Sequence, residues 1–200
     1  MNRREALQRT AMMLGYAVSA PALAGVLNGC KARPELAFKP TFFNEDQALS
    51  IEILAEIIIP KTTTPGAKDA GVPGFIDQML KEVYSKENQD KFLKGLTEFD
   101  NDAKKIYGNN FTTCNATEQL SLFKKHHDAA FEKPLTPPTI GWWNPRHGGE
   151  RPFVIHLKEL VILGFFTSQI GASDVLQYVE VPGPFKGCVP LTQVGKTWAT

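Results

Sequence analysis

The chain has 200 residues, of which 42% are hydrophobic and 22% are charged, and its formal net charge at pH 7 is +1. This length suits one domain with a substantial core, and the apolar content argues against intrinsic disorder. The near-neutral charge argues against nucleic acid and against an anionic lipid surface as partners.

Residues 1–29 are predicted to be an export signal. Arg3 and Arg4 precede a moderately apolar stretch, and small residues follow it, which is the order of parts in a secretory signal. Because Gly15 and Pro21 interrupt this stretch, it is too short and broken to be a stable membrane span. The arginine pair resembles the twin-arginine class, which carries proteins that are already folded. The alternative is an ordinary buried amphipathic helix.

Cys30 closes a Leu-Asn-Gly-Cys run, residues 27–30, that resembles a lipobox. Lipidation there would anchor the chain firmly, since two acyl chains suffice for stable attachment. The alternative is cleavage near Ala24, which would leave Cys30 as a free thiol. Removing residues 1–29, which carry three Arg and one Glu, would change the net charge from +1 to about −1. We expect a lipidated tether over 30–40, a domain over 41–200, and a membrane-anchored chain on the periplasmic side of the cell envelope.

Cys114 and Cys188 are the other two cysteines of the chain. In an oxidising compartment they could form one disulfide, and an intermolecular bridge or two buried free thiols are the alternatives. The absence of CxxC and Cys/His spacing disfavours a structural zinc site and an iron–sulfur cluster.

Two helices are predicted in the first part of the domain. Asn44 and the acidic residues after it indicate a helix start, and apolar positions at helical spacing continue to Ile58, before Pro60. Residues 60–73 contain too much proline and glycine for a regular element. A second, shorter helix follows between Phe75 and Val83.

The third and fourth helices have clear start signals. Ser85 is a candidate cap for the third helix, Gly108 ends it, and Asn115 opens a capping box for the fourth. The positions expected to face inward on the third helix are Phe92, Leu93, Leu96, Phe99, Ala103 and Ile106. Those expected on the fourth are Leu120, Phe123, Ala130 and Phe131.

A loop over 133–151 leads to a fifth helix that starts at Pro152, and the chain after Gly171 becomes a tail rich in proline and glycine. No run of alternating strands and no repeat is visible. The prediction is an all-α fold, with about five helices in one compact domain, long irregular loops and a C-terminal tail. Val181, Phe185 and Val189 are apolar tail residues that something should cover. We favour a partner's surface over the chain's own helices.

Patterns that carry chemistry are scarce. His126 and His127 are adjacent, so on a helix they point about 100° apart and cannot bind one metal from one face. His156 and Glu159 have the spacing of half a carboxylate-bridged metal site, but an ordinary helix-surface pair is favoured. Because GxSxG, GxGxxG and P-loop motifs are also missing, we predict no catalytic, cofactor-binding or metal-binding residue in this chain.

Trp142 and Trp143 lie in an aromatic loop that ends at His147. Such a loop could bind a sugar by stacking. Docking onto another protein is at least as good an interpretation, because exposed Trp and Arg are favoured interface anchors.

Several motifs together resemble one family. They are Ile-Ile-Ile-Pro-Lys-Thr at 57–62 with Thr-Pro-Gly-Ala at 64–67, Gly-Val-Pro at 71–73 with Phe-Ile-Asp at 75–77, Lys-Glu-Leu at 158–160 with Gly-Phe-Phe-Thr-Ser at 164–168, and Gly-Cys-Val-Pro at 187–190. With the signal, they resemble the gluconate 2-dehydrogenase subunit 3 family, the small subunits of membrane-associated flavin dehydrogenases. The likeness extends over nearly the whole chain.

The resemblance implies a non-catalytic subunit. Its partner would be a flavoprotein of the glucose–methanol–choline (GMC) type that holds FAD and oxidises a sugar or sugar acid, often with a cytochrome c subunit that accepts the electrons and contains haem c. The small subunit would carry the export signal for the flavoprotein and stabilise it. The alternative function is a stand-alone lipoprotein that binds or processes carbohydrate through the loop from Trp142 to His147.

Overall fold

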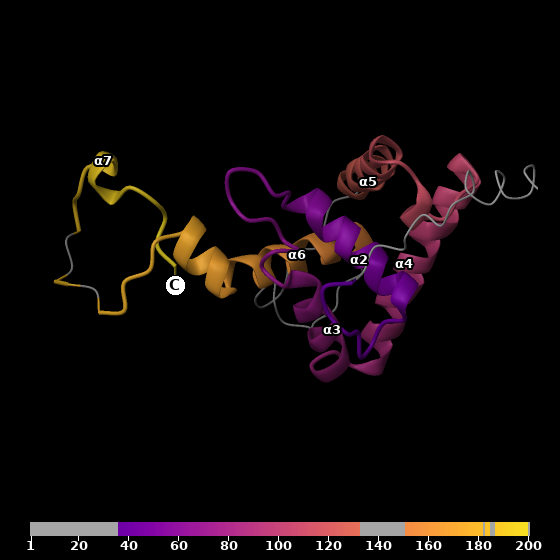
Figure 1. Ribbon diagram of the computed structural model, residues 1–200, viewed down its shortest axis with the longest axis horizontal. Coiled ribbons are helices and arrows are strands. Elements are labelled where there is room, and N and C mark those ends of the chain that lie inside the picture. Colours follow the sequence, from indigo (N-terminus) through magenta and orange to yellow (C-terminus); the bar gives the residue numbers. More distant parts are fainter. Residues whose placement is uncertain (1–35, 133–150, 182, 185–186, 200) are drawn as a thin grey trace, which may run out of the picture. The chain divides into compact units, whose positions relative to one another are not determined.

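The computed structural model describes residues 36–132, 151–181, 183–184 and 187–199, and the chain from Leu36 onward forms one compact unit. The longer helices are α2 (Glu45–Ile58), α3 (Val72–Glu82), α4 (Lys86–Tyr107), α5 (Ala116–Phe131) and α6 (Phe153–Phe166) (Figure 1). Three shorter elements are the 3-10 turn η1 (Phe111–Thr113), the π-helical turn η2 (Gly171–Val175) and α7 (Leu191–Val194). The described residues contain one isolated β-bridge and no longer strand, so the predicted all-α fold is confirmed.

The helix boundaries follow the predicted signals closely. Asn44 and Asn115 both form complete capping boxes, and the Ser85 side chain accepts a hydrogen bond at the start of α4. Gly108 ends α4 with φ of 74°, a left-handed conformation that favours glycine. The second helix starts earlier than expected, because Gly71 adopts φ of 69° and a proline occupies the first turn of α3.

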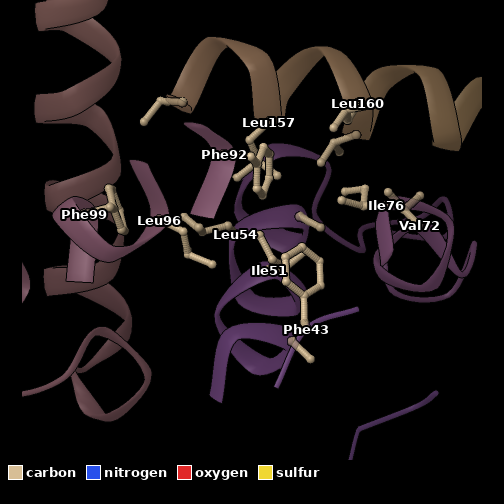
Figure 2. Close-up of a cluster of buried hydrophobic side chains, with 14 of the residues drawn as sticks. Phe43, Ile51, Leu54, Val72, Ile76, Phe92, Leu96, Phe99, Leu157 and Leu160 are labelled. Atoms are coloured by element: carbon tan, nitrogen blue, oxygen red, sulfur yellow. The ribbon is translucent and has the colours of Figure 1, made fainter. Parts of the chain in front are cut away.

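Helix α6 contacts α2, α3, α4 and α5, which explains why it is apolar almost all round (Figure 1). Figure 2 shows the core between these helices. Its buried members include Ile51 and Leu54 from α2, Val72 and Ile76 from α3, Phe92, Leu96 and Phe99 from α4, and Leu157 and Leu160 from α6. No helix among the described residues has the length and apolar character needed to span a membrane.

Glycine allows two close helix contacts. A Cβ at Gly95 of α4 would lie 2.5 Å from the Cβ of Phe153, and a Cβ at Gly164 of α6 would lie 2.6 Å from the ring of Phe75. The glycine of the Gly-Phe-Phe-Thr-Ser motif therefore allows α6 to approach α3.

Three positions predicted to face inward are exposed. Leu120 and Phe131 of α5 are each 55% exposed, and Ile106 at the end of α4 is 45% exposed. Helix α5 packs mainly on α6 through a narrow stripe that includes Leu122 and Ala130, so Leu120 lies on its flank.

The core also includes residues that precede α2. Phe43 is buried, and Leu36, Phe38 and Phe42 pack against the buried cluster. Residues 36–40, expected to belong to a tether, thus contact the domain.

Candidate docking surface

The C-terminal tail forms a loop whose two ends are joined. The main chains of Gln177 and Trp198 form a parallel bridge, with hydrogen bonds of 2.9 Å from Gln177 N to Thr197 O and from Ala199 N to Gln177 O. The Gln177 side chain also donates to Val194 O over 2.8 Å. Figure 1 shows the yellow tail running outward and returning to this point. We call residues 177–199 the tail loop.

Gly171 provides the exit from α6 toward the tail loop. A Cβ at this position would overlap the carbonyl oxygen of Phe165, so the π-helical turn requires glycine here. Lys196 donates to Asp174 O over 2.5 Å, a second link between this turn and the end of the loop.

The tail loop exposes a group of large apolar side chains. Tyr178, Val179, Val181, Val189 and Trp198 are exposed by 62%, 45%, 81%, 43% and 47%, respectively. The other large exposed hydrophobic side chains of the described residues are spread along the helices and the end of α3. The chain's own helices therefore leave these tail residues uncovered, as a protein interface would require.

The two cysteines of the domain are both free thiols. Cys114 is buried in the core, where its thiol faces Asn109 O, and Cys188 is exposed on the tail loop. Burial raises the pKa of the Cys114 thiol, and the charges of Glu118 and Asp100 raise it further. The structure thus gives no support to a bridge between Cys114 and Cys188.

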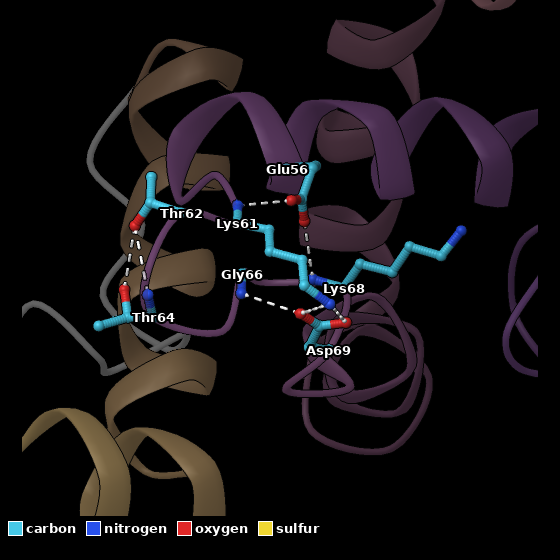
Figure 3. Close-up of polar contacts among 7 residues, drawn as sticks. All are labelled: Glu56, Lys61, Thr62, Thr64, Gly66, Lys68 and Asp69. Carbon is cyan, nitrogen blue, oxygen red and sulfur yellow. Dashed lines mark hydrogen bonds and ion pairs between the residues drawn. The ribbon is translucent and has the colours of Figure 1, made fainter.

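The Thr-Pro-Gly-Ala motif lies in a loop that carboxylates hold in place, with Thr64 exposed and Gly66 and Ala67 buried (Figure 3). One Glu56 oxygen accepts from Lys61 N over 2.7 Å and the other from Lys68 N over 3.1 Å. Asp69 accepts from Gly66 N and pairs with the Lys61 ammonium at 3.0 Å. A Cβ at Gly66 would lie 2.5 Å from a Glu56 oxygen, so this glycine allows the loop to pass over the carboxylate.

The hydrogen bond from Lys61 is the main cause that lowers the pKa of Asp69, and the Gly66 N–H lowers it further. Thr62 and Thr64 contact each other across the loop, and residues 61–64 are exposed. These residues therefore give the loop a fixed shape.

His156 is held inside the helical body. Its Nε2 lies 2.7 Å from the Tyr84 hydroxyl, and its ring packs edge-on against Phe92. Burial, with a smaller contribution from the Arg151 charge, lowers the pKa of His156 to about 4, and burial raises the pKa of Tyr84 to about 12. Glu159 pairs instead with Arg151, so the expected surface pair between His156 and Glu159 does not form.

His126 and His127 have different neighbours, as the helix geometry predicts. His126 Nε2 lies 3.1 Å from an Asp102 oxygen, and His127 Nε2 lies 3.2 Å from the Lys158 ammonium. The part of the chain that the structure describes contains no group of His, Cys, Asp and Glu that could hold a metal ion.

Most of the site residues predicted from sequence lie outside the described residues. These are Arg3 and Arg4 of the export signal, Cys30 of the lipobox, and the docking candidates Trp142, Trp143 and Phe185. Their assignments stay predictions.

Two buried carboxylates were missed in the sequence. Asp77 is 1% exposed and Glu52 is 4% exposed, and both lie within apolar runs of helices. Glu52 pairs with the Lys68 ammonium at 2.5 Å. An acidic residue between core positions was the available signal, because a buried carboxylate needs partners.

An apolar loop that the fold leaves uncovered is typical of a surface that binds another protein. The family model for gluconate 2-dehydrogenase subunit 3 matches residues 45–183, more than half of the chain. The chain belongs to this family, and the predicted resemblance is confirmed. The family is named for a subunit of a dehydrogenase complex, so the chain associates with other subunits of such a complex. No curated protein and no solved structure shows significant similarity to the chain.

Proposed function

We propose that this chain is the non-catalytic small subunit of a periplasmic FAD-dependent dehydrogenase that oxidises a sugar or sugar acid. Its main partner is a GMC-type flavoprotein, which it stabilises and for which it carries the export signal in residues 1–29. FAD and catalysis belong to that partner, and a cytochrome c subunit with haem c accepts the electrons. The observation that carries this proposal is the closed, apolar tail loop in a member of a dehydrogenase-subunit family.

The tail loop suits docking onto a folded partner. Aromatic and aliphatic side chains dominate the centre of protein interfaces, and burying one contributes about 1.5–3 kcal/mol. A loop that is joined at its ends and stiffened by proline loses less conformational entropy when it binds. The loop contains only three charged residues, Glu180, Lys186 and Lys196, which favours an apolar patch on the partner over a strongly charged surface.

A matched pair of substitutions tests the docking assignment. Val181→Asp places a charge on the tail loop, and Val83→Asp places the same charge on another exposed valine, which is 51% exposed after α3. In cells that produce both subunits, Val181→Asp should weaken co-purification of the flavoprotein, measured by flavin absorbance, while Val83→Asp should not. Equal effects of the two variants would contradict docking through the tail loop.

A deletion from Val181 onward gives a second measurement. It should leave the helical circular dichroism of the isolated subunit nearly unchanged, because the core lies before the tail loop, and it should weaken co-purification. Unfolding of the truncated chain would instead assign the tail to the subunit's own stability. A colourless monomer that binds sugar would favour the stand-alone carbohydrate-binding lipoprotein.

Export supplies an independent test. Changing Arg3 and Arg4 to lysine should leave both this subunit and its flavoprotein in the cytoplasm, since the pair is the address that the export receptor reads. Cell fractionation with flavin detection measures this. A flavoprotein that still reaches the periplasm would contradict the escort role.

A further inference from the structure

Asp77 is an almost fully buried carboxylate that none of the roles above uses. It lies on α3 between core residues and is 1% exposed. Both of its oxygens are occupied. Oδ2 accepts from the N–H and the hydroxyl of Thr41, each over 2.8 Å, and Oδ1 accepts from Phe42 N over 3.0 Å and Phe43 N over 2.9 Å.

These bonds hold a segment that covers the core. Residues 36–43, here called the strap, precede α2 and contain no helix or strand. Phe43 is 5% exposed and its ring lies near Phe92 of α4, while the Phe38 ring contacts α3 at Gly74. Figure 2 shows Phe43 at the edge of the core cluster beside α2. The strap therefore completes the apolar cluster that the helices leave open on this side.

Asp77 accepts three backbone N–H groups of the strap, and Glu52 of α2 accepts a fourth, from Ala37 N over 3.5 Å. Thr41, Phe42 and Phe43 are consecutive, and their N–H groups all donate to Asp77, more than thirty residues away. If the carboxylate were lost, all three donors would lose this partner, and the loss would be most costly for the N–H of Phe43, which is buried.

The charge on Asp77 is stabilised in place. Burial is the largest single influence and raises its pKa, but the hydrogen bonds from Phe43, Thr41 and Phe42 together lower the pKa below its usual value. The carboxylate is thus ionised at neutral pH and accepts charge-assisted hydrogen bonds, which are stronger than neutral ones. Because it is buried and fully engaged, it is not available to a substrate.

We propose that Asp77 is the latch of the strap, meaning the side chain whose hydrogen bonds hold the strap on the core. Because the strap leads to the N-terminus, its closure couples that segment to completion of the helical core. An open strap would expose Phe38 at the end of the predicted tether, and Phe42 and Phe43 directly after it. A twin-arginine route carries folded proteins, so a chain with an open strap would be exported poorly. This coupling rests on the proposed export role, whereas the latch itself does not.

Hydrogen–deuterium exchange of the purified mature chain tests the latch. Asp77→Asn keeps the size of the side chain but removes its charge and one of its two acceptor oxygens. The amides of residues 41–43 should then exchange about tenfold faster or more, since each bond to a charged group contributes enough for roughly a tenfold change. Amides in α4 and α5 should keep their protection.

Asp100→Asn is the matched control. Asp100 also accepts a backbone N–H, that of Phe111 over 2.9 Å, but it lies on α4 and does not touch the strap. Its replacement should leave exchange of residues 41–43 unchanged. Equal exchange of the strap in the two variants would overturn the latch, as would strap amides that exchange at unfolded-chain rates in the unchanged protein.

A milder variant covers the case in which Asp77→Asn unfolds the whole chain. Thr41→Val removes only the hydroxyl bond to Asp77 and keeps a similar shape. It should raise exchange several-fold within the strap alone. Faster exchange everywhere, or no change in the strap, would overturn the proposal.

Export of the precursor tests the coupling. The exported fraction of Asp77→Asn should fall relative to Asp100→Asn, measured by fractionation. Normal export of Asp77→Asn with a demonstrably open strap would overturn the coupling. If the precursor with Asp77 intact is still exported after Arg3 and Arg4 are changed to lysine, the proposed function is contradicted. The exchange experiment then still decides whether Asp77 is the latch.

Discussion

The contact between α4 and α6 allows a sharp prediction, because it depends on a missing methyl group. A Cβ at Gly95 would lie 2.5 Å from Phe153 Cβ and 3.0 Å from its Cγ. These atoms are next to the backbone, so Phe153 cannot move away by rotating its ring. Gly95→Ala should therefore force the two helices apart, at a cost of about 1–3 kcal/mol.

Helix propensity opposes this cost. Replacing glycine by alanine inside a helix stabilises it by about 0.5–1 kcal/mol. The net effect of Gly95→Ala should be a loss of up to about 2 kcal/mol in the free energy of unfolding. Gly74→Ala is the matched control within α3, since the nearest atoms to its new Cβ would be at an ordinary 3.6 Å, on the Phe38 ring. It should be neutral or stabilise by up to about 1 kcal/mol.

Urea unfolding followed by circular dichroism measures both variants. Their midpoints should shift in opposite directions with unchanged slopes. If Gly95→Ala is as stable as Gly74→Ala, the close approach of α4 and α6 is not the reason for glycine at this position, and the reasoning from contact distance fails.

Two further predictions concern the anchor and acid stability. Cys30→Ser should release the mature chain from the membrane fraction without changing its helical content, and unchanged attachment would mean that another subunit supplies the anchor. His156 should make the fold sensitive to acid, because its pKa is about 4 when folded and 6.5 when unfolded. The unfolded chain binds the proton first, so stability is full above about pH 6.5 and falls by up to about 3 kcal/mol toward pH 4. His156→Gln should flatten this part of the stability profile, and parallel profiles of the two proteins would refute the assignment.

The helix ends could be predicted because their signals are local. Asn44, Ser85 and Asn115 each cap a helix through a residue three positions later, and Gly108 acts through its own backbone conformation. A pattern of three or four residues contains all the information that such a cap needs.

The inward face of α5 could not be predicted in the same way. Leu120 and Leu122 are both apolar, and only the position of α6 decides that Leu122 is buried while Leu120 is exposed. The strap was missed for a related reason, since residues 36–43 have no periodicity and their partner, Asp77, lies on a later helix. Tertiary partners, not local patterns, determine these features.

For the candidate site, the sequence indicated that the tail's apolar residues would need a cover, and the structure places Val181 and Val189 in solvent. It did not indicate that the tail forms a closed loop. The bridge between Gln177 and Trp198 joins two irregular segments through backbone groups. Because nearly every residue has the same backbone N–H and C=O groups, the side-chain sequence does not predict such a bridge.

The segment between α2 and α3 is rich in proline and glycine and forms no regular element, but acidic side chains hold it in place. Glu52 and Glu56 lie one turn apart on α2 and hold Lys68 by its ammonium and its backbone N–H, respectively. Asp77 on α3 holds the strap in the same manner. Because the helices supply the acceptors, the loops need no regular hydrogen bonding of their own, and their exposed residues keep a defined shape. A surface fixed in this way binds a partner at a lower entropic cost than a flexible one, which suits a subunit whose role is to associate.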